Sequence, residues 1–277
     1  MKRLLKSDFK KFFRDKLFLV VLILAVVFAV ITPLLYIVLL GMMGEADPMT
    51  EAMLAGYVNA KGQFFSSFSF GNNLGLIAPL LIGIVLFKDF SSGTIRNKII
   101  SGHSRISIFL SMFIVCMTAL FGIVLAHALL TLGISLPFFD YQETPFVLSD
   151  FWYLLISLFF EFLVYLFVAV FVTWLCVMMK NIGMVIVMYI AIVFGFTMVA
   201  GILQMVIAAL SMSDSNQQLL DILNFLQRIN LFNSSATIGI GNSYTTADVC
   251  YYVITPVVGV LALLWHGIWR FAKKDLK

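Results

Sequence analysis

Residues 17–40 read LFLVVLILAVVFAVITPLLYIVLL, a run of 24 residues without a charged side chain. A helix needs about 20 apolar residues to cross the roughly 30 Å hydrocarbon core of a bilayer, so this stretch is long enough to span a membrane. It is too long for a cleavable signal, whose apolar stretch is about 7 to 15 residues, and no A-x-A site ends it. We therefore expect a transmembrane helix that stays in the mature protein.

Five further apolar runs follow along the chain. The six runs are residues 17–40, 70–87, 108–132, 152–179, 182–210 and 250–269. Only 12% of the 277 residues are charged, about half of what an average soluble domain carries. The sequence predicts an all-α integral membrane protein with one domain of six transmembrane helices. Because Asn72, Asn73 and Pro79 interrupt the second run, we expect it to start nearer Phe64 and to bend at Pro79.

The basic residues predict the orientation of the chain, because Lys and Arg are retained on the cytoplasmic side of a membrane. Sixteen of the 18 basic residues lie in residues 1–16, 88–107 and 270–277 or at Lys180. Six spans then place both termini in the cytoplasm of a multi-pass protein of the cell membrane. The net charge of +4 is a topology signal on this reading, and no nucleic-acid partner is expected.

Two segments outside the spans have amphipathic patterns. Residues 1–16 have an apolar face and a basic face, made respectively by Leu5, Phe9, Phe12 and Phe13 and by Arg3, Lys10, Lys11 and Arg14. This pattern is typical of an interfacial helix that contacts membrane lipids. Residues 211–249 begin polar and become amphipathic between Leu219 and Ile229, which predicts a short helix lying on or dipping into the outer leaflet. A solvated surface helix and a gate over a translocation path are both open readings of that segment.

Common catalytic and metal-binding motifs are missing from the sequence. There is no G-x-x-x-x-G-K-[ST] loop for nucleotide phosphates, no H-E-x-x-H for zinc and no G-x-S-x-G for a serine hydrolase. Cys116, Cys176 and Cys250 have neither metal-site nor disulfide spacing. We therefore predict no catalytic residue, no metal ligand and no cofactor in this chain, and we do not expect an enzyme.

Residues 88–105, KDFSSGTIRNKIISGHSR, differ from an ordinary connection between spans. Ser91 or Ser92 can cap a short helix, and Gly102 can end it in a left-handed turn. The apolar residues expected to face the bundle or the bilayer are Ile95, Ile99 and Ile100. The residues expected to be exposed are Thr94, Arg96, Asn97 and Lys98. Such a helix would offer hydrogen bonds and positive charge to a soluble partner.

This loop resembles the signature of type-2 ABC exporter permeases, in which an acidic and an aromatic residue precede G-T-I-R-N-K and G-x-S-R follows. The matching residues are Asp89, Phe90, Gly93, Thr94, Ile95, Arg96, Asn97, Lys98, Gly102, Ser104 and Arg105. The family also has an N-terminal interfacial elbow helix, six spans and re-entrant helices between the last two spans. The chain departs from the pattern at Ser111-Met112, where the family often has Ser-Lys.

The resemblance implies a cytoplasmic coupling helix that seats in a separately encoded nucleotide-binding ATPase subunit, which would bind ATP and Mg. The residues that it assigns to that interface are Asp89, Gly93, Thr94, Arg96, Asn97, Lys98, Gly102, Ser104 and Arg105. Two permeases would form one translocation path, so the second partner is an identical copy or a sister permease. The expected cargo is a hydrophobic or amphipathic molecule such as a peptide or drug, because Phe and Met are abundant in the spans.

Glu161 is the one acidic residue inside a predicted span. Burying it ionised costs about 3 kcal/mol or more, so we expect a partner or a wet cavity, and His127 on the neighbouring span is the candidate partner. The pair is either a structural hydrogen bond or a polar contact that lines a path or links transport to protons. The alternative function is accordingly an ion-coupled secondary transporter that uses Glu161, although no internal repeat supports it. An intramembrane enzyme would need a nucleophile or metal cluster that the sequence lacks.

Overall fold

The computed structural model describes residues 1–43, 59–70, 73–142, 144–211, 217–239 and 243–274. Six of its helices are long and apolar enough to cross a membrane. They are α2 (Lys16–Met43), α5 (Asn73–Ser91), α7 (Arg105–Ser135), α8 (Leu148–Met178), α9 (Ile182–Ser211) and α12 (Thr246–Lys273). Each contains all or most of one predicted apolar run, although α5 starts at Asn73 rather than at residue 70 and α8 ends at Met178 rather than at residue 179, and no strand is found in the described ranges. The prediction of an all-α, multi-pass membrane protein is confirmed at this level.

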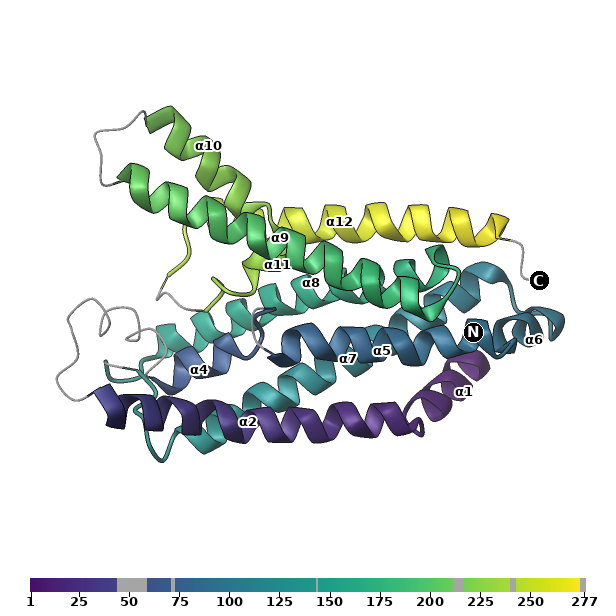
Figure 1. The fold of residues 1–277 in the computed structure, drawn as a ribbon, viewed down its shortest axis with the longest axis horizontal. Helices are drawn as coiled ribbons and strands as arrows, with labels where there is room; N and C mark the ends of the chain where they lie inside the picture. The colour runs from purple at the N-terminus through teal and green to yellow at the C-terminus, as the bar shows by residue number, and fades with distance from the viewer. Residues whose placement is uncertain (44–58, 71–72, 143, 212–216, 240–242, 275–277) are drawn as a thin grey trace.

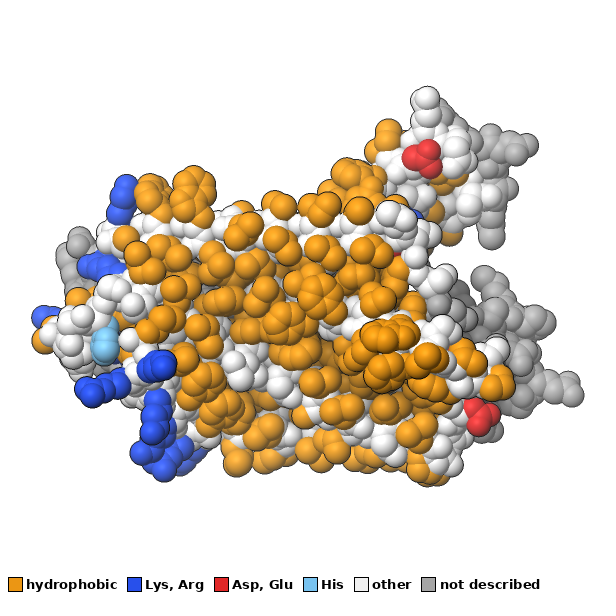
Figure 2. Space-filling model, turned by 180° about the vertical axis from the view of Figure 1, so that it is seen from behind, with side chains coloured by type: hydrophobic (Ala, Val, Ile, Leu, Met, Phe, Trp, Pro, Cys, Tyr) orange, Lys and Arg blue, Asp and Glu red, His pale blue; other side chains and the backbone are white. Residues whose placement is uncertain are grey.

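Helices α7 and α8 form the centre of the bundle, with α2, α5 and α12 packed around them (Figure 1). Their inward faces are buried along nearly their whole length. By contrast, α9 and α12 leave most of their apolar side chains exposed, as at Val187 and Leu261. Large exposed apolar surfaces mark sites of contact with a membrane or with another protein, and the length of these helices favours the membrane. Figure 2 shows hydrophobic side chains over the middle of the molecule and Lys and Arg side chains gathered at one end.

The segment before the second span differs from its prediction. The chain forms a separate buried helix, α4 (Ala60–Ser66), which Asn59 caps by accepting a hydrogen bond from the Gly62 N–H at 2.6 Å. Helix α5 then begins anew at Asn73. A Cβ on Gly75 would lie 2.2 Å from the Ser69 carbonyl oxygen, so only glycine permits this close approach.

Lys61 of α4 is one of the two basic residues that the six-span topology leaves on the outer side, and it is only 6% exposed. Its ammonium lies 4.8 Å from the centre of the Tyr153 ring. Burial lowers the pKa of Lys61, and the nearby Asp150 carboxylate only partly offsets this effect. Lys61 is therefore part of the folded bundle rather than a free loop cation.

The segment between the last two spans folds back onto the bundle. Helix α10 (Gln217–Arg228) runs alongside α9, and α11 (Leu231–Ser234) follows it (Figure 1). Phe232 of α11 is buried, and its ring centre lies 5.6 Å from those of Phe70 and Phe171. The predicted short helix between Leu219 and Ile229 is confirmed as α10, while its position in a leaflet stays a prediction.

Candidate functional site at the basic end

Helix α1 (Lys2–Phe12), a short helix α6 (Thr94–Ile100) and the end of α12 all lie at one end of the molecule (Figure 1). This is the end where the basic side chains gather (Figure 2). The side chains of α1 that are buried are Leu4, Asp8 and Phe12, while Phe13 is exposed. Helix α1 therefore packs one face against the bundle, with an acidic residue at the centre of that face.

Two glycines set the ends of α6. The chain turns from α5 into α6 at Gly93, whose φ is 69°, and Gly93 rather than a serine occupies the N-cap position. The predicted serine cap is wrong, because a reversal at this point needs positive φ, which glycine adopts at little cost. Gly102, with φ 87°, ends α6: its N–H donates to the Ile99 carbonyl and the His103 N–H to the Lys98 carbonyl. That left-handed ending was predicted and is confirmed.

The faces of α6 differ in exposure. Ile95 is buried and Ile99 packs against the core, whereas Ile100 is 74% exposed. Arg96 and Asn97 are exposed on the outer face. Lys98, predicted to be exposed, has only 11% of its side chain accessible, so that prediction is wrong.

Lys98 points inward because its ammonium forms ion pairs with two carboxylates. Its ammonium lies 2.8 Å from the Asp8 carboxylate of α1 and 2.8 Å from the Asp89 carboxylate near the end of α5. Burial lowers the pKa of Lys98, but Asp89 and Asp8 outweigh that effect and the pKa ends above its ordinary value. The Ser111 hydroxyl of α7 donates to Asp8 at 2.7 Å. One ion-pair cluster thus joins α1, α5, α6 and α7.

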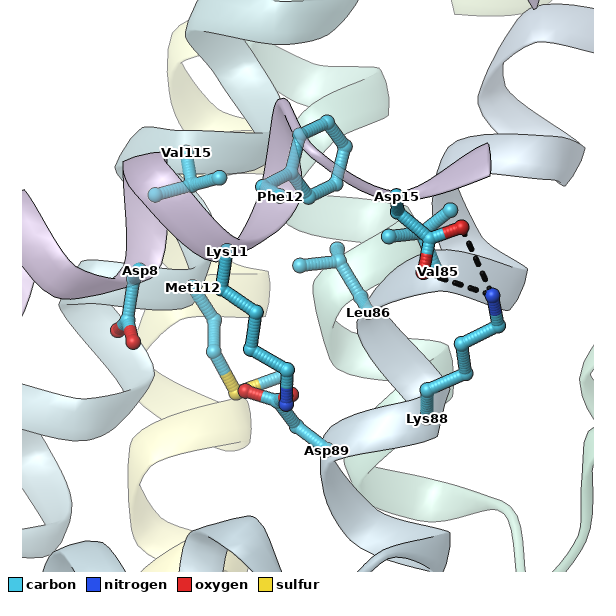
Figure 3. Close-up of a pocket in the computed structure, with 10 residues that line it drawn as sticks. All are labelled: Asp8, Lys11, Phe12, Asp15, Val85, Leu86, Lys88, Asp89, Met112 and Val115. Atoms are coloured by element: carbon cyan, nitrogen blue, oxygen red, sulfur yellow. Dashed lines mark hydrogen bonds and ion pairs between the residues drawn. The ribbon is translucent and has the colours of Figure 1, made fainter. Parts of the chain in front are cut away.

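Further contacts extend this cluster along α1. Lys11 pairs with Asp89, as Figure 3 shows, and its ammonium also donates to the Thr94 hydroxyl of α6 at 3.1 Å. Beside it, the Lys88 ammonium lies 2.7 Å from the Asp15 carboxylate in the turn between α1 and α2 (Figure 3). Burial raises the pKa of Asp15, yet the hydrogen bond from Lys88 and further contacts bring it below its ordinary value.

The hollow between these side chains holds only about 30 Å³, and its apolar wall is made by Phe12, Val85, Leu86, Met112 and Val115 (Figure 3). A volume of this size accommodates one or two water molecules. The cluster therefore connects the helices to one another, and its hollow is too small for a ligand larger than water. We use the name ion-pair joint for Asp8, Lys11, Asp15, Lys88, Asp89 and Lys98.

Sequence reasoning missed Asp8, Asp15 and Ser111 as members of the site. A signal for Asp8 was present, since it falls four residues after Leu4 and four before Phe12, on the face that proves to be buried. An acidic residue on the buried face of a basic helix indicates a buried cation from elsewhere in the fold. No comparable pattern singles out Ser111.

Arg105 and Ser104 have roles within the chain. The Arg105 guanidinium donates to the carbonyls of Phe271, Ala272 and Lys274 at 3.0, 3.1 and 2.6 Å, which satisfies the end of α12. The Ser104 hydroxyl caps α7 by accepting from the Ser107 N–H at 3.2 Å. Of the polar side chains that the resemblance assigns to an ATPase interface, Arg96 and Asn97 are those that α6 presents outward.

Glu161 and His127 are both fully buried, on α8 and α7. Among the described residues neither the Glu161 carboxylate nor the His127 ring has a hydrogen-bond partner, so the expected hydrogen bond between them is not formed. The prediction of a hydrogen-bonded pair is therefore wrong, although both side chains lie inside the bundle.

Comparisons with family models, with curated proteins and with solved structures find no match to this chain. The resemblance of residues 89–105 to the ABC permease signature therefore rests on those residues. Within the described ranges, no group of three or more His, Cys, Asp or Glu side chains is placed to hold a metal ion. The feature that the structure adds is the ion-pair joint behind α6.

Proposed function

We propose that the chain is the membrane subunit of an ATP-driven ABC exporter that forms the path for a hydrophobic or amphipathic cargo and binds a separate ATPase subunit through α6. The observation that carries the proposal is the asymmetry of α6. Its inner face is fixed by Ile95 and by the Lys98 ion pairs, while its outer face presents Arg96 and Asn97. A helix that is fixed to the bundle on one face and exposed on the other is suited to bind a soluble partner and to transmit its movement to the bundle.

A movement of α6 can reach the rest of the bundle in two ways through the ion-pair joint. The contact between Lys98 and Asp8 leads to α1 and on to α2, and the contact between Lys98 and Asp89 leads to α5. Buried, charge-assisted contacts at 2.8 Å resist separation better than solvated ones. On this proposal, closure of the ATPase subunits moves α1 and α5 together, and α1 acts as an elbow.

The proposed orientation places the basic end in the cytoplasm, with both termini there. It is supported by the gathering of Lys and Arg side chains at this end (Figure 2). A complete exporter would contain a second bundle, either an identical copy or a sister permease.

A crosslinking and purification experiment tests the proposed partner. With Cys250 changed to Ser, the variant N97C should crosslink in intact membranes to a soluble protein that carries a G-x-x-x-x-G-K-[ST] loop, because Asn97 lies on the outer face of α6. The matched control is V187C on the exposed apolar face of α9, which should give no such product. The proposal fails if N97C captures no ATPase and the chain also purifies alone after mild extraction at physiological salt.

Ion-coupled secondary transport is a second candidate, favoured by the buried Glu161 carboxylate without a hydrogen-bond partner among the described residues. We expect E161Q to retain assembly and ATP-dependent transport, since Gln preserves the size of the side chain and the exporter needs no charge there. Transport into vesicles driven by ATP, or by a proton or sodium gradient, measures the difference. Loss of gradient-driven transport in a folded E161Q protein would favour the second candidate.

A further inference from the structure

The last turns of α12 carry two tryptophans beside two cations on the surface of the bundle. Trp265 is 78% exposed, and Trp269, Arg270 and Lys273 are exposed as well. A hollow of about 330 Å³ lies against Trp265, His266 and Trp269. The ion-pair joint and α6 make no use of these side chains.

The neighbouring helix fixes the shape of this groove. The Trp174 indole of α8 donates a hydrogen bond to His266 Nδ1 at 2.8 Å, which turns His266 toward the bundle. Trp265 and Trp269 are left on the outward side. Leu261 and Val258, one and two turns further along α12, are also exposed, so an apolar track continues away from the basic end.

The two cations lie close to one ring. The Lys273 ammonium is 4.3 Å and the Arg270 guanidinium carbon 5.8 Å from the centre of the Trp269 ring. Neither forms an ion pair with another residue in the described part of the chain. The next cation, Lys274, is already engaged, since its ammonium donates to the Val177 carbonyl at 2.6 Å. Positive charge therefore stands uncompensated at the mouth of the groove (Figure 2 shows the basic end).

We propose that this groove binds an anionic phospholipid, with an acyl chain against Trp265 and Trp269 and the phosphate on Arg270 and Lys273. Tryptophan side chains favour the headgroup level of a membrane, and basic residues at that level attract anionic lipids. A zwitterionic lipid is a poorer ligand, because its ammonium group is repelled by the same two cations. The site uses α12 and α8 alone and does not depend on the exporter proposal.

Quenching of tryptophan fluorescence by brominated lipid tests the site. In a W152F protein reconstituted in vesicles, Trp265 and Trp269 contribute most of the exposed indole. We expect acyl-brominated phosphatidylglycerol at low mole fraction to quench with about 25-fold higher apparent affinity than brominated phosphatidylcholine, about fivefold from each of the two cations. The difference should shrink at high salt.

Variants then assign the preference to the two cations. R270Q/K273Q should quench equally with both lipids, whereas K2Q/K6Q, which removes two exposed cations from α1 at the same end, should keep the preference. Equal quenching by both lipids in the W152F protein would overturn the proposal. So would a preference that survives R270Q/K273Q, or the absence of quenching by either lipid, which would mean that another protein surface covers the groove.

Discussion

Lys98→Met is expected to destabilise the protein by about 3 to 5 kcal/mol, the usual cost of removing one partner from a buried ion pair. The side chains of Asp8 and Asp89 are 8% and 14% exposed, so the substitution leaves two carboxylates poorly solvated and without their shared cation. Because the pKa of Lys98 is raised, its contribution to stability is complete below the ordinary lysine pKa and is lost only as the pH rises through the higher value. Thermal unfolding in detergent at neutral pH measures the effect.

The control for this prediction is K2M, which removes an exposed lysine from the start of α1 and should change stability by less than about 0.5 kcal/mol. The double variant D8N/K98M should be less destabilised than the sum of its single variants, since the neutral amide that replaces the Asp8 carboxylate needs no cation. If K98M has the same unfolding temperature as the parent protein, the ion-pair joint does not hold α6 in place. The proposed transmission of movement from α6 to α1 would then be ruled out as well.

Run length was enough to predict the six spans, because a bilayer imposes a minimum length on any helix that crosses it. The sharp ending of α6 at Gly102 was also predictable, since a left-handed C-terminal turn is a local property of glycine. The start of α6 was not: Ser91 and Ser92 offered a local cap, but the reversal out of α5 placed Gly93 there instead. Local sequence describes each helix end by itself and does not contain the angle between two helices.

The contents of the ion-pair joint depend on tertiary structure. Lys98 looks like a solvated cation in sequence, and it is buried because Asp8, far earlier in the chain, is carried to it on α1. Helix α4 was not predicted for a similar reason: Lys61 and Gln63 are polar, yet both are buried, with the Gln63 amide oxygen accepting from the Ser135 hydroxyl at 2.6 Å. Glu161 and His127 were paired by their approximate depth in neighbouring spans, and depth alone does not determine whether two side chains meet; the expected hydrogen bond is not formed.

In the proposed complex with an ATPase subunit, Arg96→Glu is expected to lower ATP hydrolysis and transport by about tenfold or more, since a like-charge contact at an interface costs several kcal/mol. Arg96 is exposed on the outer face of α6 and takes no part in the ion-pair joint, so the fold of the isolated chain should be unchanged. Thermal stability of the purified R96E protein checks this point. ATP hydrolysis by the reconstituted complex, with and without cargo, then measures coupling.

Arg3→Glu is the matched control, because it makes the same charge change at an exposed position of α1 at the same end of the molecule. It alters the balance of basic residues that sets topology as much as R96E does, but it leaves the outer face of α6 intact. A loss confined to R96E would therefore locate the ATPase contact at α6, and R96K should retain part of the activity because it keeps the charge without the planar fork of donors. Equal activity of R96E and R3E complexes would instead remove α6 from the interface, leaving the ion-pair joint as a structural element of the bundle.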